Sequence, residues 1–117
     1  TPSLQIDALQ HKALVYGIMF RDSKTAITVL KQAEKALQSY HENNKPALQT
    51  SIYESFAQGY NQRGDITSAL KYAELSVAIA TEHKLPKAEL QSRLIAGRLE
   101  NLNPLLGRLA PGSRDFH

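Results

Sequence analysis

Residues 60–70, YNQRGDITSAL, decide how this chain folds, because they hold the end of one helix and the start of the next. Gly64 falls just past the last apolar position of the preceding helix, where glycine adopts the left-handed conformation without a Cβ clash. Asp65 can accept the free N–H groups of a new helix, and its carboxylate suits the positive helix end. Arg63-Gly64-Asp65, a tripeptide that integrin ligands display on protruding loops, is therefore interpreted as a tight helix-to-helix turn.

Apolar residues at helical spacing continue on both sides of this turn. Before it, Ile52, Phe56 and Tyr60 recur every four residues, as one face of an amphipathic helix requires. Pro46 and Pro86 suit the first turn of a helix, because the N–H that proline lacks would have no partner there. The pattern predicts an all-α chain of about five helices, over residues 4–20, 26–40, 46–60, 65–83 and 86–102.

Composition and length favour one helical domain. The chain has 117 residues, of which 42% are hydrophobic and 21% charged, which suits a single domain with a modest core. We assign residues 1–102 to this domain and residues 103–117, which are rich in proline and glycine, to a partly disordered C-terminal extension. No apolar run approaches the roughly 18 residues that a membrane span needs. We therefore expect no membrane association and a cytoplasmic location.

Positive charge is concentrated at the C-terminal end. Residues 84–117 contain six Lys or Arg against three Asp or Glu, whereas residues 1–83 contain eight of each kind. This excess fits either a solvated flank or a surface that docks an acidic partner. Nucleic-acid binding is not predicted, because the strip formed by Lys84, Lys87, Arg93 and Arg98 lacks aromatic side chains on which bases could stack.

No pattern of catalytic or metal-binding residues occurs in the sequence. The four histidines, His11, His41, His83 and His117, are far apart, and none forms a pair with metal-ligand spacing. There is no glycine-rich phosphate loop, no serine in a nucleophile elbow and no cysteine. We therefore predict no enzymatic activity, no metal and no cofactor.

The unit over residues 53–79 resembles a tetratricopeptide repeat (TPR). The positions at the spacing of that family are Tyr53, Phe56, Ala57, Tyr60, Gly64, Asp65 and Ala69. Small residues such as Ala57 and Ala69 let the two helices of a hairpin approach closely, while the aromatic residues fill the space around them. The resemblance implies about two and a half repeats of antiparallel helical hairpins, stacked into a short right-handed solenoid over about residues 4–102.

Other parts of the chain depart from the family pattern. Arg21-Asp22 stands where the better unit has Gly-Asp, and Leu14 and Gly17 occupy positions where a small residue and an aromatic residue are usual. Ser76 replaces the usual alanine at the end of the better unit. The apolar spacing of the second helix would also serve as the seam of a plain up-and-down helical bundle, which is the rival fold.

A stacked TPR solenoid implies protein binding, because its inner surface is lined by the first helix of each hairpin and holds a peptide. The inner positions expected on the third and fifth helices are Ser51, Glu54, Gln58, Asn61, Gln62, Arg93, Arg98 and Asn101. Those expected on the first helix are His11, Val15, Ile18 and Met19. A clamp for chaperone C-terminal carboxylates is not implied, since His11, Val15 and Ser55 stand where that subtype has lysine and asparagine.

These patterns predict a non-catalytic module that binds a peptide or partner protein, with an acidic partner suited to the basic end. The alternative is a regulatory or oligomerisation domain of a larger signalling or transcription-regulating protein. In that case Val15, Ile18 and Met19 pair with a second copy, as a homodimer, or with another domain. A peptide receptor would be a monomer whose binding depends on Gln58 and Asn61, whereas charged residues at Ile18 and Met19 would abolish self-association.

Overall fold

The computed structural model describes the backbone of residues 2–109 and the side chains of residues 4–101. It contains five α-helices and a π-helical segment, η1 (Val15–Met19), that continues the first of them. The helices are α1 (Pro2–Leu14), α2 (Ser23–Gln38), α3 (Lys45–Gln62), α4 (Ile66–Glu82) and α5 (Pro86–Leu109). No strand occurs between residues 2 and 109, so the predicted all-α class is confirmed. The helix α5 continues past residue 102, where the expected fifth helix ends, and the remainder of the expected disordered extension lies outside the described residues.

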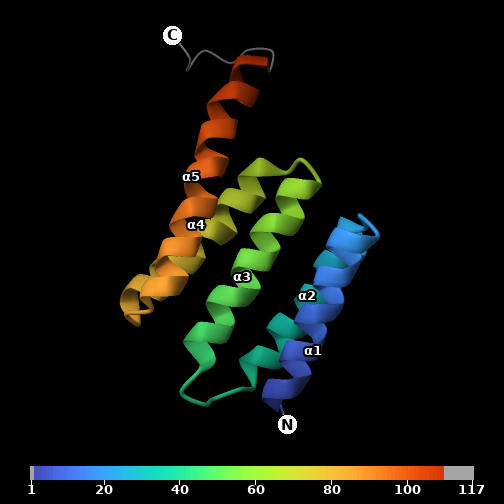
Figure 1. The fold of residues 1–117 in the computed structure, drawn as a ribbon, viewed down its shortest axis with the longest axis vertical. Coiled ribbons are helices and arrows are strands. Elements are labelled where there is room, and N and C mark those ends of the chain that lie inside the picture. The colour runs from blue at the N-terminus through green and yellow to red at the C-terminus, as the bar shows by residue number, and fades with distance from the viewer. Residues whose placement is uncertain (1, 110–117) are drawn as a thin grey trace.

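The helices form two layers (Figure 1). In one layer α1, α3 and α5 lie side by side, and α2 and α4 lie behind them. Each helix packs against the next along the chain, and α3 also contacts α5 and, more sparsely, α1. Side chains from three separate segments of the sequence therefore meet on a single face of the molecule.

Two clusters of buried side chains hold the layers together, and a group of aromatic rings joins them. Phe56 is fully buried and stacks on Tyr72 of α4, with ring centroids 4.7 Å apart. Tyr72 also stacks on Tyr60 at 5.6 Å, and both tyrosines pack against both clusters. Ala57 and Ala69, the small residues expected between the helices of this hairpin, are fully buried, which lets α3 and α4 pack closely.

The turn between α3 and α4 has the predicted structure. Gly64 has a φ of +83°, and the Asp65 side chain accepts a hydrogen bond from the Ser68 backbone N–H at 3.1 Å. Asp22 caps α2 in the same way, accepting from the Thr25 N–H at 3.1 Å. Hydrogen bonds from Ser68 and Thr25 hold the pKa values of Asp65 and Asp22 below their ordinary range. The interpretation of residues 63–65 as a helix-to-helix turn is therefore confirmed.

The segment η1 departs from the regular helix expected over residues 4–20. In the turn after α3, the Asp65 N–H donates to the Tyr60 carbonyl, whereas in the turn after η1 the Asp22 N–H donates to the Tyr16 carbonyl. The second of these hydrogen bonds therefore spans one residue more than the first. A π-helical turn contains one more residue than an α-helical turn, and this accounts for the difference.

This extra residue explains two departures from the family pattern. Because of it, Tyr16 rather than Gly17 takes the structural position that Tyr60 has in the next hairpin. By the same shift, Ala13 rather than Leu14 corresponds to the small residue of that hairpin. Ala13 is buried and Leu14 is exposed, as this shifted correspondence requires.

Candidate functional site

Three adjoining hollows lie on the face made by α1, α3 and α5. The Arg21 pocket, between η1 and the C-terminal half of α3, has a volume of about 530 Å³. The central hollow, between α1 and the middle of α3, has about 240 Å³, and the Pro86 pocket, between α3 and the start of α5, has about 630 Å³. Leu14 and Ser55 line both the Arg21 pocket and the central hollow, while Ser51 lines both the central hollow and the Pro86 pocket. The hollows therefore adjoin one another along α3, and together they are called the groove.

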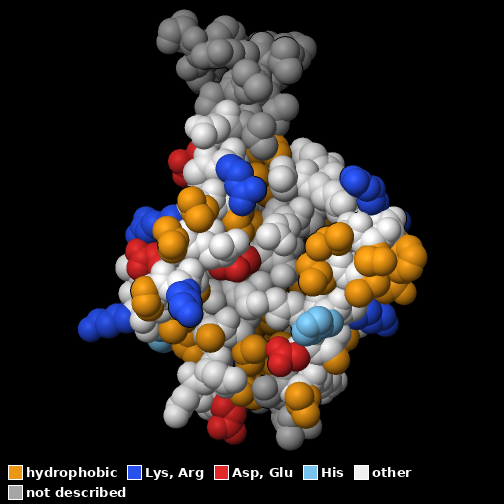
Figure 2. All heavy atoms as spheres, in the orientation of Figure 1, with side chains coloured by type: hydrophobic (Ala, Val, Ile, Leu, Met, Phe, Trp, Pro, Cys, Tyr) orange, Lys and Arg blue, Asp and Glu red, His pale blue; other side chains and the backbone are white. Residues whose placement is uncertain are grey.

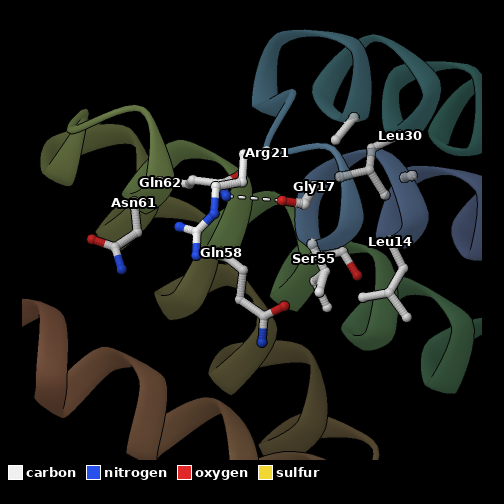
Figure 3. A pocket seen from close by; sticks show the side chains of 12 residues that line it. Leu14, Gly17, Arg21, Leu30, Ser55, Gln58, Asn61 and Gln62 are labelled. Carbon is white, nitrogen blue, oxygen red and sulfur yellow. Dashed lines mark hydrogen bonds between the residues drawn. The ribbon is translucent and has the colours of Figure 1, made fainter.

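Figure 2 shows this face hollowed along α3, with hydrophobic side chains gathered on both sides, over α1 and α5. The floor comes from α3, as expected from the spacing of its polar residues. Gln58, Asn61 and Gln62 line the Arg21 pocket (Figure 3), and Glu54 of the same helix lines the Pro86 pocket. The structure thus brings all four of these expected residues to the groove.

The expected residues of the first helix are divided. His11 lines the central hollow and Ile18 lines the Arg21 pocket. Val15 and Met19 are exposed but line none of the three hollows. The π-helical turn contributes to this division, because it changes the direction in which successive side chains point.

The expected residues of α5 lie outside the groove. Arg93, Arg98 and Asn101 are exposed and line none of the three hollows. Arg93 instead pairs with Glu89, one helical turn away, with a nitrogen-to-oxygen distance of 2.9 Å. The α5 side of the groove is formed nearer the helix start, where Lys87 lines the Pro86 pocket.

Glu54 belongs to a polar network that joins α3, α4 and α5. The Ser92 hydroxyl donates to the Glu54 carboxylate at 2.9 Å, and the hydroxyls of Ser92 and Ser76 lie 2.6 Å apart. The Ser76 hydroxyl oxygen also lies 3.2 Å from the Thr50 carbonyl oxygen, so the single Ser76 proton is shared between this carbonyl and Ser92. Both serines are fully buried, so each hydroxyl needs these partners. The departure from alanine at Ser76 is therefore explained by a buried hydroxyl that links three helices.

The α1 side of the groove is joined to α3 by a second set of polar contacts. The Gln10 amide of α1 donates to the Ser51 hydroxyl and, at 3.4 Å, to the Ser55 hydroxyl. The Gln62 amide donates to the Gly17 carbonyl of η1 at 2.8 Å. A helix C-terminus leaves carbonyls without intrahelical donors, and Gln62 supplies one. These bonds set the position of α1 and η1 against α3.

Glu54→Gln is expected to make the stability of the fold less dependent on pH. Burial raises the pKa of Glu54, and the hydrogen bond from Ser92 offsets part of that effect. The folded protein then binds the proton more tightly than the unfolded chain, so the wild type loses stability as pH rises from the ordinary glutamate value, about 4.3, through the raised pKa. Glutamine carries no charge and keeps an oxygen that can accept from Ser92.

Urea unfolding of both proteins from about pH 4 to about pH 8 measures this effect. The free energy of unfolding of the wild type should fall relative to that of Glu54→Gln over the window. Glu74→Gln, which changes an exposed glutamate of α4, is the matched control. Parallel pH profiles for the wild type and Glu54→Gln would show that the carboxylate is not desolvated.

Comparison with protein-family models, curated proteins and solved structures finds no match. Within the described residues, no helix is both long and apolar enough to cross a membrane. Among the residues that the structure describes, no three His, Asp or Glu side chains are grouped closely enough to hold a metal ion.

Proposed function

We propose that this chain is a non-catalytic, TPR-like interaction module that binds a segment of a partner protein in the groove across α1, α3 and α5. The adjacency of the three hollows carries the proposal. Leu14 and Ser55 line both the Arg21 pocket and the central hollow, and Ser51 lines both the central hollow and the Pro86 pocket, so one extended ligand can contact all three. An elongated groove of this kind suits a polypeptide better than a small molecule, which usually binds in one enclosed pocket.

The order of the helices supports the TPR-like part of the proposal. The first helix of each hairpin, α1, α3 and α5, lines the groove, whereas α2 contributes only Ala26 and Leu30, at the Arg21 pocket, and α4 contributes no lining residue. This is the arrangement expected of stacked TPR hairpins. The burial of Ala57 and Ala69 and the left-handed Gly64 agree with the roles of the matched positions.

The chemistry of the groove also suits a peptide. Gln58 and Asn61 are exposed, and their side-chain amides make no hydrogen bond among the described residues, so these amides are free to pair with a peptide backbone. Leu14 and Ile18 are exposed by 47% and 67%, which offers apolar surface for a peptide side chain.

Selection of random dodecapeptides displayed on phage tests this proposal. The enriched peptides are synthesised and titrated against the wild type and against Gln58→Ala/Asn61→Ala, which should weaken binding by about tenfold, as expected for two lost hydrogen bonds of about 0.7 kcal/mol each. Gln32→Ala/Gln38→Ala removes two exposed amides from α2, outside the groove, and should bind like the wild type. Equal affinities for both double variants, or no enriched peptide, would exclude the groove as a peptide receptor.

A specific observation favours the oligomerisation domain as a second candidate. Val15, Ile18 and Met19 are exposed by 44%, 67% and 74%, and Leu14 and Phe20 extend the apolar surface. Exposed apolar patches of this kind often mark interaction surfaces.

Light scattering behind a sizing column distinguishes the oligomerisation domain from the peptide receptor, because Met19 lies outside the groove and can be changed without altering it. A dimer that Met19→Glu converts to a folded monomer supports self-association, and a monomeric wild type supports the peptide receptor.

The cytoplasmic location and the absence of nucleic-acid binding remain predictions.

A further inference from the structure

The Arg21 pocket is lined by one charged side chain, that of Arg21, and by no Asp or Glu. Arg21 is the only ionisable residue that lines the pocket, and within the described residues it forms no ion pair and no hydrogen bond through its side chain. The neighbouring carboxylate, Asp22, is already used, because it accepts from the Thr25 N–H and, at 2.6 Å, from the Thr25 hydroxyl. The guanidinium is therefore available to an anion from outside the chain.

The backbone conformation of Arg21 determines the direction in which its side chain leaves the turn. Arg21 has a φ of +51°, a left-handed conformation that residues with a Cβ adopt at a cost. The hydrogen bond from the Asp22 N–H to the Tyr16 carbonyl at 2.8 Å holds the turn in this form. Lys84 has a similar φ of +56° in the turn before α5, so the conformation alone does not mark a site. The pocket beside Arg21 distinguishes it from Lys84.

The other walls of the pocket are of two kinds. Leu14, Ile18 and Leu30 form an apolar side, and Gln58 and Asn61 form an amide side. Figure 3 shows the Arg21 side chain directed toward the amide side, with Leu14 and Leu30 across the pocket. A ligand that fills this space needs an apolar group for one side and a negative group for the other.

We infer that the Arg21 pocket binds an Asp or Glu side chain of the partner segment, next to an apolar side chain that packs on Leu14 and Ile18. A guanidinium pairs with a carboxylate through two parallel hydrogen bonds, which the neighbouring amides of Gln58 and Asn61 can supplement. The inference rests on the proposed function, since the acidic residue belongs to a polypeptide that continues along the groove. The charge that selects the partner is thus in the turn between η1 and α2 rather than on α5.

Peptide selection on charge-reversed variants tests the inference. Random dodecapeptides are displayed at the N-terminus of the phage coat protein, so that they carry no free C-terminal carboxylate. The wild type should enrich Asp or Glu beside a large apolar residue, and Arg21→Glu should enrich Lys or Arg at the same place. Arg63→Glu is the matched control, because Arg63 is exposed at the end of α3 but does not line the pocket. It should keep the preference for acidic peptides.

Titrations then measure the pairing directly. Replacing the selected acidic residue by Gln should weaken binding to the wild type by about tenfold and to Arg21→Gln by less than about twofold, because the pairing is already lost in that variant. Peptides that depend on Gln58 and Asn61 but show no acidic preference, or an unchanged preference in Arg21→Glu, would overturn the inference alone. If no selected peptide depends on Gln58 and Asn61, the proposed function fails and the inference fails with it.

Discussion

Phe56→Ala is expected to lower the free energy of unfolding by about 3–5 kcal/mol. The Phe56 ring is fully buried, and its centroid lies 4.7 Å from that of Tyr72 and 6.3 Å from that of Tyr60. Alanine removes the transfer energy of the ring, leaves a cavity between α3 and α4, and ends both stacking contacts. Because a domain of this size is stable by only about 5–15 kcal/mol, this loss is a large part of the total.

Equilibrium unfolding in urea, followed by circular dichroism at a helical wavelength, measures the change. Phe20→Ala is the matched control, since Phe20 is 67% exposed and contacts an aromatic ring only at Tyr16, among the described residues. Its expected cost is below about 1 kcal/mol. Similar costs for the two variants would mean that Phe56 is not at the centre of the core.

Ala69→Leu is expected to destabilise the fold by about 2–3 kcal/mol. Ala69 is fully buried between α3 and α4, in the same cluster of buried side chains as the small residue Ala57. A leucine side chain cannot fit there unless the helices move apart, and that movement would weaken the stacking of Tyr72 on Phe56.

The same substitution at an exposed position of α4 provides the comparison. Ala78→Leu should change the stability by less than about 0.5 kcal/mol, because its side chain extends into solvent. Thermal unfolding of both variants distinguishes them. A stable Ala69→Leu variant would contradict the close approach of the two helices.

The helices and the turn at Gly64 could be predicted because their signals are local. Apolar residues every three or four positions define a helix face, and a Gly-Asp pair supplies both a left-handed residue and a helix cap. The departures from the TPR pattern at Leu14 and Gly17 could not be explained from such local signals. They depend on a π-helical turn, which leaves no clear pattern in the residues themselves.

The groove could be predicted only in part. Gln58 and Asn61 follow from the helix face of α3, whose direction is set by the buried side chains beside them. The position of Arg21 on the groove was not predicted, although Arg-Asp in place of Gly-Asp was a visible signal, because it depends on the pocket between η1 and α3. On α5 the residues expected to bind were Arg93, Arg98 and Asn101, whereas the structure places Lys87 on the groove.

The network of Ser76, Ser92 and Glu54 could not be predicted at all, because its members come from three helices. It also has a mechanical consequence for the groove. The α5 wall is attached to α3 through buried hydroxyls that would lose their partners if the helix slid. The α1 wall is attached through the partly exposed amides of Gln10 and Gln62, which can exchange their partners for water at little cost. The α5 side of the groove is therefore held to α3 by contacts that cost more to break than those on the α1 side.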